Sequence, residues 1–359
     1  MRVAVLWTRL SGYMNVALRA VASRGCEILV VNEASSPDAP FDGREFAWIA
    51  HRHEFSGRPE LSKVAGAVES FRPDVTLCSW HVGVYQSVCL RLRGRVLRVG
   101  CGDNQWRGTL KQQIGRLIAP VHLRRFYDVL FMPGERQMMW ARKMGFAEER
   151  IWQGLFTCDV DAFSRARSLR RPDVQAFVCA ARLSQEKGIR LLVKAYGLYR
   201  QRCEGPPWTL ILAGDGPLRE EALNVPGVDW RGFVQPTRLP AVFAEAGCFV
   251  VPSIFDSWCV ALHEAACAGL PLVATSACGA AVHLLQDGYN GCIVSPNSAD
   301  SMAAAMERMA GKTPGQLAEM GRRSAELSKQ FSPERFADTV LERGNEIWSV
   351  VRRTGFAQY

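Results

Sequence analysis

The chain lacks several features that would place it in a simple class of protein. None of its apolar runs approaches the ~20 residues that a transmembrane helix needs. The opening MRVAVLW is too short for a signal peptide and reads as a first β-strand, so we expect a cytoplasmic protein. Its twelve cysteines form no CxxC pair and no Cys/His motif. We therefore predict reduced, mostly buried thiols, and neither a disulfide frame nor a zinc site.

Motifs for other common functions are missing as well. A GxGxxG fingerprint follows neither of the two strands that would open a dinucleotide-binding unit, which argues against a nicotinamide-dependent Rossmann enzyme. The formal net charge is +9, yet no RNA- or DNA-binding motif accompanies it, so nucleic acid explains the charge poorly. Internal repeats and low-complexity segments are absent from the sequence.

What is present is a regular alternation of strand-like and helix-like segments over 359 residues. This length suits two domains, and the alternation predicts parallel sheets covered by helices on both faces, an α/β fold. The Arg- and Ser-rich stretch around Pro172 reads as a linker. We expect domains over residues 1–163 and 175–332, a linker over 164–174, and a C-terminal segment over 333–359. Its residues 333–351 form a long amphipathic helix with Phe336, Val340, Ile347 and Trp348. The strands are predicted at Val3–Trp7, Glu27–Val31, Val75–Cys78, Arg95–Val99, Val129–Met132, from Gln175, and at Leu210–Ala213, Val228–Trp230, Cys248–Val251, Leu272–Ala274 and Gly291–Val294.

Positive charge is concentrated in two segments of the first half. Arg91, Arg93, Arg95 and Arg98 lie close together, and residues 108–128 form a second basic segment. In that segment Leu110, Ile114, Leu117 and Ile118 recur at helical spacing. We favour an ordinary surface helix whose apolar face packs on the core. The alternative is a basic amphipathic helix that lies on anionic lipid or holds an anionic acceptor.

The segment from Val251 to Thr275 holds two acids separated by seven residues. Asp256 follows a strand, in the loop where open α/β sheets bind ligands. Glu264 lies on the next helix, whose amino-terminal end favours phosphate. Such an arrangement suits a nucleotide-sugar, because one acid can hold the sugar and the other the nucleoside.

Two further segments of the second half carry the chemistry of phosphate binding. Arg182 and Lys187 follow the first strand of that half, where their charges can stabilise a departing diphosphate. Gly214 and Gly216 end a later strand in the sequence GDGP. Glycine lets the backbone approach a ligand closely, although an ordinary strand-to-helix turn has the same sequence.

These three segments, in this order, resemble the retaining GT-B glycosyltransferases of family 4. The resemblance implies two Rossmann-like domains facing a cleft, a final helix that returns to the first domain, and transfer that retains the anomeric configuration. It implies Arg182, Lys187, Asp256 and Glu264 as the catalytic residues, with Asp256 on the donor sugar and Glu264 on the ribose. It also implies no cofactor and no metal, with a UDP- or GDP-sugar as donor. The donor-binding residues implied are Gly12, Gly214, Gly216, Gly232, Ser257, Trp258, Cys259 and Val260.

The chain departs from the family pattern at several positions of this segment. Asp256 stands where Glu is usual, and a carboxylate withdrawn by about 1 Å alters how a donor is held. Cys259 stands where Gly is common. His283 occupies a Glu position in CGAAVHLLQDGYNG, and we interpret it as a structural substitution. The family's His that touches the donor sugar has no counterpart, since Gly102 and Asp103 stand there.

Candidates for the acceptor site follow two predicted strands of the first half: His81, and the group Asp103, Asn104 and Trp106. They fall at carboxyl ends of strands, although a lone histidine is more often structural. Asp159 and Asp161 imitate a DxD metal motif, but they precede the expected linker, so we reject a metal site there.

Together these observations predict a glycosyltransferase that acts on a glycan or lipid-linked acceptor in cell-surface polysaccharide or glycoconjugate synthesis. We expect it in the cytoplasm, with possible peripheral contact to an anionic inner membrane face. Two alternatives stay open: a nucleotide-sugar epimerase with the same fold, and a nucleotide-sugar-binding or scaffold protein whose activity has decayed.

Overall fold

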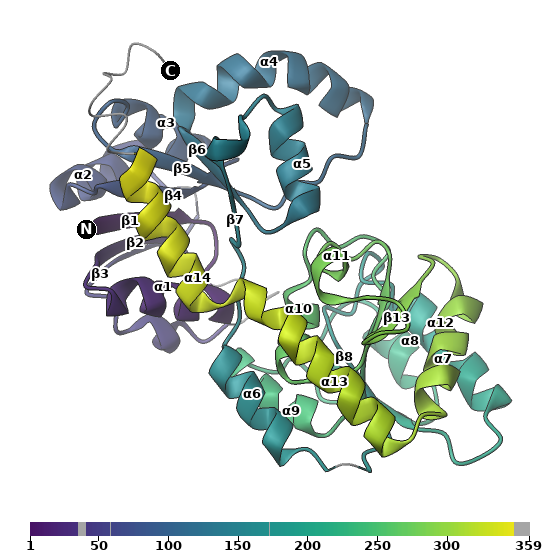
Figure 1. Ribbon diagram of the computed structural model, residues 1–359. Helices are drawn as coiled ribbons and strands as arrows, with labels where there is room; N and C mark the ends of the chain where they lie inside the picture. Colours follow the sequence, from purple (N-terminus) through teal and green to yellow (C-terminus); the bar gives the residue numbers. More distant parts are fainter. Residues whose placement is uncertain (35–40, 58, 172, 348–359) are drawn as a thin grey trace. The chain divides into compact units, whose positions relative to one another are not determined.

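The computed structural model describes residues 1–34, 41–57, 59–171 and 173–347 (Figure 1). Its contacts divide the chain into two compact units, one formed by residues 1–157 and 331–359, the other by residues 158–330. Pro172 and Trp348, which we assigned to the linker and the final helix, lie outside the described residues. Within the part of the chain that is described, no helix is both long and apolar enough to span a bilayer.

The first unit is built on a seven-stranded parallel sheet with the order β3-β2-β1-β4-β5-β6-β7. The expected strands are present within two residues of their predicted starts, and they are apolar and buried. Two edge strands were not predicted, because β3 is polar (HRHEF) and β7 has only three residues. The strands are β1 (Arg2–Trp7), β2 (Glu27–Glu33), β3 (His51–Phe55), β4 (Val75–Ser79), β5 (Leu97–Cys101), β6 (Val129–Met132) and β7 (Ile151–Gln153).

Helices cover both faces of this sheet because successive strand residues point to opposite sides. Val3 and Val5 pack with α1 and α14, whereas Ala4 and Leu6 pack with helices of the other face. The final helix begins at Pro333 and contacts α1 and the sheet of the first unit, as the family resemblance implies (Figure 1). The helices are α1 (Gly12–Ser23), α2 (Leu61–Phe71), α3 (Gly83–Arg91), α4 (Leu110–Phe126), α5 (Glu135–Lys143) and α14 (Pro333–Asp338), which continues into a π-helical turn, Thr339–Arg343.

The second unit has a six-stranded parallel sheet with the order β10-β9-β8-β11-β12-β13. This order has the doubly wound pattern, in which the strand order reverses between β8 and β11. The strands are β8 (Ala176–Ala180), β9 (Thr209–Ala213), β10 (Val228–Trp230), β11 (Cys248–Val251), β12 (Leu272–Thr275) and β13 (Gly291–Val294). The helices are α6 (Val160–Leu169), α7 (Ile189–Arg202), α8 (Arg219–Leu223), α9 (Leu239–Ala244), α10 (Val260–Cys267), α11 (Ala281–Leu284), α12 (Ala299–Ala310) and α13 (Pro314–Ser328).

The chain is helical where we expected the linker to begin. Asp159 caps the first turn of α6, since its carboxylate accepts a hydrogen bond of 2.8 Å from the backbone N–H of Ala162. Phe163 and Ala166 are buried one turn apart, and the arginines and serines occupy the outer side. The polar composition of residues 164–169 therefore reflects an exposed helical face, and the carboxylate of Asp159 has a structural partner.

The preferred interpretation of the basic segment in the first half is wrong. In α4 the large apolar side chains point outward, with exposed fractions of 76% for Leu110, 75% for Leu117 and 74% for Val121. The buried face consists of Ala119 and Leu123, so only a few side chains of this helix pack on the core. Arg98 is likewise not a surface charge, because it is buried in a two-point ion pair with Asp128, 2.6 Å at its closest.

Candidate functional site

The reversal of strand order in the second unit selects one place for a ligand, the carboxyl ends of β8 and β11. The loop after β8 carries Arg182 and Lys187, and the loop after β11 carries Asp256. Lys187 Nζ and Asp256 Oδ2 are 2.7 Å apart, so an ion pair joins the two loops. The structure thus brings two predicted catalytic residues, 69 positions apart in the chain, into direct contact.

The backbone of the same loops fixes this pair in place. The N–H of Ile254 donates to the carbonyl of Glu186 over 2.9 Å. Gly188 has φ of +71°, and a Cβ on it would lie 2.0 Å from the carbonyl oxygen of Pro252. Only glycine fits there, because any side chain would push the two loops apart.

The ion pair is partly withdrawn from water, and this sets its charge state. The Lys187 side chain is 28% exposed and the Asp256 side chain 9%. Burial opposes the charged form of Lys187, but the carboxylate of Asp256 outweighs it and raises the pKa of Lys187 above its ordinary value. Lys187 is therefore a fixed cation at the switch point at neutral pH.

The GDGP turn after β9 lies against the loop that carries Arg182. A Cβ on Gly214 would lie 1.9 Å from the carbonyl oxygen of Ala181, and one on Gly216 would lie 2.6 Å from that of Leu183. The N–H of Leu183 also donates to the carbonyl of Asp215 over 2.9 Å. The two glycines are thus required by loop packing, and that packing supports the loop on which Arg182 is exposed.

Gly232 lies next to this turn, at the end of β10. Its carbonyl accepts a hydrogen bond of 2.7 Å from the N–H of Gly214. Its φ is +65°, and an added Cβ would meet only the ring of Trp230 at 3.6 Å. The guanidinium carbon of Arg219 lies 4.0 Å from the centroid of the Trp230 ring. The indole N–H of Trp230 donates to the Gly214 carbonyl. The predicted donor-binding residue Gly232 therefore lies beside a cation–aromatic pair.

The start of α10 has an unusual backbone. Cys259 precedes the helix with φ of +72°, one of three non-glycine residues with positive φ in the described part of the chain. A left-handed conformation costs a residue with a side chain roughly 1–2 kcal/mol, and such strain collects at functional sites. Of the other donor-site predictions here, Ser257 and Val260 are partly exposed, whereas the side chain of Trp258 is 1% exposed. Trp258 can therefore face a ligand only through its backbone.

Glu264 lies on α10, one turn beyond the helix start. Its side chain is mostly enclosed, and burial raises its pKa to about 7. The neighbouring His263 opposes this shift in pKa and Cys267 adds to it. A ligand that offers hydroxyl donors to this carboxylate would favour its charged form.

The acceptor-site candidates gather at the carboxyl edge of the sheet in the first unit. The order β1-β4-β5 makes the loops after these strands neighbours. The indole N–H of Trp80 donates to Asn104 Oδ1 over 2.6 Å, which joins the loop after β4 to the loop after β5. His81 is exposed, Asp103 and Trp106 are partly exposed, and Gly12 opens α1 after β1. Uncharged and aromatic groups therefore predominate at this edge.

Two residues of the segment CGAAVHLLQDGYNG have structural roles. Asp287 Oδ1 accepts a hydrogen bond of 2.8 Å from the N–H of Ile293. His283 lies beside the buried ring of Trp258, with 5.9 Å between the ring centroids, and its carbonyl accepts from Gln330. These contacts agree with our interpretation of His283 as a structural substitution.

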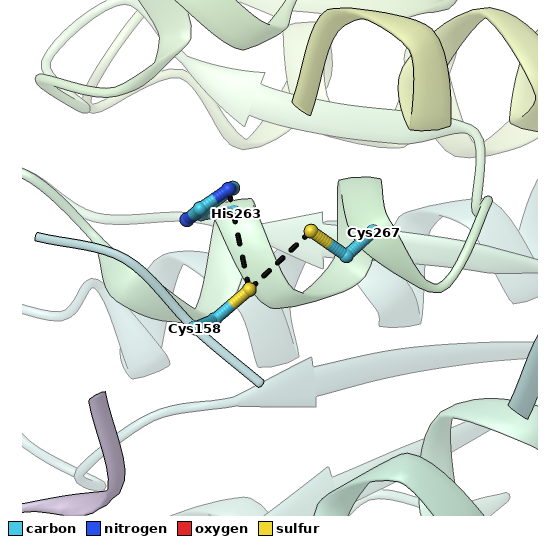
Figure 2. A group of neighbouring side chains, drawn as sticks. All are labelled: Cys158, His263 and Cys267. Atoms are coloured by element: carbon cyan, nitrogen blue, oxygen red, sulfur yellow. Dashed lines mark hydrogen bonds between the residues drawn. The ribbon is translucent and has the colours of Figure 1, made fainter. Parts of the chain in front are cut away.

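One group of residues was missed entirely. Cys158, His263 and Cys267 lie together in the second unit and are buried (Figure 2). His263 and Cys267 stand four positions apart on α10, which places them on one helical face, and this spacing was the available sequence signal. The third member, 105 residues before His263, could not be inferred from spacing.

Part of the chain is similar in sequence to known glycosyltransferases. Residues 174–312 match the family described as "Glycosyl transferases group 1", a range that begins just before β8 and holds the ion pair and Glu264. A D-inositol 3-phosphate glycosyltransferase of Paenarthrobacter aurescens is 30% identical over 193 residues, which cover 51% of this chain and 47% of that protein. The match thus spans about half the length of that relative.

Solved structures are similar over almost the whole chain. HepE of Anabaena, solved in complex with UDP-glucose, aligns with a TM-score of 0.72 at 18% identity and covers 98% of this chain and 100% of that one. Sucrose-phosphate synthase of Thermosynechococcus elongatus gives 0.72 at 15% identity, with the same coverage. The chain therefore has the two-domain Rossmann-like fold of GT-B glycosyltransferases, and residues 174–312 are similar to the group 1 family.

Proposed function

We propose that this protein is a retaining glycosyltransferase that moves a sugar from a nucleoside diphosphate to a hydroxyl group of a glycan or lipid-linked acceptor. The observation that carries the proposal is the ion pair of Lys187 and Asp256, which joins the two loops of the switch point in the second unit. The match of residues 174–312 to group 1 glycosyltransferases supports it. UDP-sugars and GDP-sugars are the donors we expect, since a solved structure with this fold holds UDP-glucose.

In this proposal the second unit binds the donor. Arg182 and Lys187 would stabilise the negative charge that grows on the diphosphate as the glycosidic bond breaks. Asp256 would accept hydrogen bonds from hydroxyl groups of the donor sugar, and its negative charge would keep Lys187 protonated. Glu264 would accept hydrogen bonds from the ribose hydroxyls. The residues 257–260 would offer backbone N–H groups to the phosphates at the start of α10.

The reaction we infer needs no protein nucleophile and no metal at the donor. The acceptor hydroxyl would attack on the face from which the diphosphate leaves, and a diphosphate oxygen would take its proton. Acceptor binding would fall to the first unit, where Asn104, Trp106 and His81 lie at the carboxyl edge of the sheet.

A membrane-bound acceptor is supported by α4. Its exposed apolar residues form one stripe, and the cations Lys111, Arg124 and Arg125 flank it. An apolar stripe with basic margins is the pattern of a helix that lies in the surface of an anionic bilayer. We propose peripheral binding to the inner membrane face through this helix, in the synthesis of a cell-surface glycan.

The donor site is tested first by thermal shift with UDP, GDP, ADP, dTDP and CMP on the wild type and Arg182→Ala. A ligand at one hundred times its dissociation constant adds about 2.7 kcal/mol of stability. We expect one nucleotide to stabilise the wild type and to lose most of this effect in the variant. Absence of any shift would overturn the proposal.

Turnover then separates transfer from the alternatives. Consumption of the nucleotide-sugar that depends on an acceptor supports a transferase, conversion of the donor without an acceptor indicates an epimerase, and binding without turnover indicates a decayed site.

Membrane binding is tested by sedimentation with vesicles of phosphatidylglycerol and of phosphatidylcholine. We expect selective binding to the anionic vesicles, lost in Leu117→Asn with Val121→Asn and kept in Leu169→Asn, whose side chain is 74% exposed on α6.

A further inference from the structure

The buried group Cys158, His263 and Cys267 lies within the second unit (Figure 2). Cys158 Sγ is 3.3 Å from Cys267 Sγ and 4.0 Å from His263 Nε2. Their exposed fractions are 1%, 0% and 2% in sequence order. Two thiols and an imidazole therefore converge on one small volume from which water is excluded.

Local structure explains why these three side chains meet. His263 and Cys267 are four positions apart on α10, so they project from one face of the helix. Cys158 lies in the segment just before α6, and α6 packs against α10. In Figure 2 the cysteine of this segment points toward the two side chains of the helix. The carbonyl oxygen of Ser328, at the end of α13, lies 3.3 Å from His263 Nε2.

The spacing of the donor atoms suits a soft metal ion. All three ligand atoms lie within 4.8 Å of one another. With Zn–S of about 2.3 Å and Zn–N of about 2.0 Å, the ligand atoms of a tetrahedral zinc site stand roughly 3.3–3.8 Å apart. The group needs only small side-chain adjustments to reach these separations. In the described part of the chain it is the single such group of His, Cys, Asp and Glu side chains.

Donor chemistry narrows the choice of ion. Thiolate and imidazole select Zn²⁺ over Mg²⁺ or Ca²⁺, which need several oxygen ligands. Structural zinc sites take four ligands, and the Ser328 carbonyl is an oxygen beside the group, 3.3 Å from His263 Nε2. Deprotonation of the thiols would accompany metal binding, because the thiolate is the ligand.

We propose that Cys158, His263 and Cys267 bind one Zn²⁺ ion per chain, in contrast to our prediction from the sequence that there is no zinc site. The ion would join the start of α6 to α10 and thereby fix the helix that carries Glu264. Its role is structural, so it is compatible with a metal-independent reaction at the donor. The proposal does not depend on the proposed glycosyltransferase activity.

The test measures metal content in the full-length chain. The protein is reduced, incubated with excess Zn²⁺ and separated from unbound metal by gel filtration. Elemental mass spectrometry then measures its zinc content. We expect one equivalent in the wild type and in Cys248→Ala, which removes a buried cysteine of β11 outside the group. We expect almost complete loss in Cys158→Ala and in His263→Ala. Co²⁺ in place of Zn²⁺ should give the visible bands of a tetrahedral thiolate complex.

A second variant guards against misfolding. His263→Cys keeps a metal ligand at the same position, so it should retain the metal that His263→Ala loses, and circular dichroism checks that both are folded. The proposal is overturned if reduced wild type binds no Zn²⁺, if folded Cys158→Ala binds as much as wild type, or if the native protein holds a Cys158–Cys267 disulfide and no metal. Nucleotide thermal shifts on the same samples report the donor site separately, so failure of one proposal is distinguishable from failure of the other.

Discussion

The two units share one topology but have different chemistry at the same topological position. In each sheet the strand order reverses once, between β1 and β4 in the first unit and between β8 and β11 in the second. At the second reversal an ion pair, Lys187 with Asp256, joins the loops. At the first, neutral groups do so: the N–H of Thr8, directly after β1, donates to Ser79 Oγ at the end of β4 over 3.3 Å. One strand further on, the indole of Trp80 donates to Asn104 and joins the loops after β4 and β5. Topology thus decides where a ligand can bind, and the loop residues decide which ligand is bound.

This difference fits a division of labour between donor and acceptor. A diphosphate needs fixed positive charge. Of the loops compared here, only those at the second reversal carry a partly buried cation, Lys187. Sugar hydroxyls and rings suit amide and aromatic side chains, which the loops after β4 and β5 provide beside the first reversal. The following predictions test whether the two units are as separate in stability and in ligand binding as this contrast implies.

The largest effect is expected in the core of the first unit. Phe336 on α14 is 1% exposed and lies 5.2 Å from the ring of Phe131, centroid to centroid. Phe336→Ala should lower the free energy of unfolding by about 3–5 kcal/mol. Hydrogen exchange measured by mass spectrometry should show faster exchange in residues 1–157 and 331–347, with residues 158–330 unchanged. Leu169→Ala, at an exposed position, should change stability by less than about 0.5 kcal/mol. Equal loosening of both units would contradict the separation.

Removal of the buried cation should be the most damaging change to activity. Lys187→Met leaves the carboxylate of Asp256 without its cation and removes charge from the diphosphate site. We expect kcat/KM to fall by about 10²–10³, the range found for loss of one electrostatic group that acts in the transition state. Initial rates with a nucleotide-sugar and an acceptor measure it.

Arg190→Met is the matched control for this variant. Arg190 also forms an ion pair of 2.7 Å, with Glu221, but both side chains are about half exposed. Exposed pairs contribute only about 0–1 kcal/mol, and this pair lies outside the switch-point loops. A similar loss of activity in both variants would show that charge in general, and not the switch point, sustains the reaction.

A smaller effect, on the acceptor and not on the nucleotide, is expected in the loops after β4 and β5 of the first unit. Asn104→Ala removes the acceptor of the Trp80 indole. Loss of one neutral hydrogen bond costs about 0.5–1.5 kcal/mol, so KM for the acceptor should rise about 2- to 12-fold. The dissociation constant of the nucleotide, measured by calorimetry, should stay the same. Weaker binding of the nucleotide with an unchanged KM for the acceptor would reverse the assignment of donor and acceptor to the two units.

The smallest effect is expected where strain and burial nearly cancel. Cys259→Gly relieves the left-handed backbone at φ of +72° but loses a buried side chain. The free energy of unfolding should therefore change by less than about 1 kcal/mol. Cys259→Val, with a β-branched side chain in the same conformation, should destabilise by about 2 kcal/mol or more. Urea denaturation compares the two, and equal stability would mean that the backbone relaxes in the valine variant.

The strands of the fold were predictable because parallel sheets covered on both faces need continuous apolar runs. Val129–Met132 and Cys248–Val251 carry that pattern and have the predicted bounds. The edge strand His51–Phe55 lacks it, since a strand exposed on one side needs fewer apolar residues. The relation between Lys187 and Asp256 was predictable only as a shared sheet edge, and their contact required coordinates.

Helical periodicity predicts that a helix forms, but it does not predict which face of the helix is buried. The stripe Leu110, Ile114, Leu117 is as regular as that of Met302, Met306 and Met309 in α12. The methionines are buried on the second sheet, whereas the α4 stripe is exposed. Both patterns satisfy the same local rule, and the surface that each helix meets decides the outcome.

Local patterns and short motifs in the amino-acid sequence are enough to predict the alternation of strands and helices, the positions of the chemical groups along the chain and the resemblance to a glycosyltransferase family. Tertiary structure alone decided that Lys187 meets Asp256, that α4 exposes its apolar side, and that Cys158 joins His263 and Cys267. Each of these depends on residues brought together from distant positions or on what lies opposite a helix. Spacing along a chain carries no information about either.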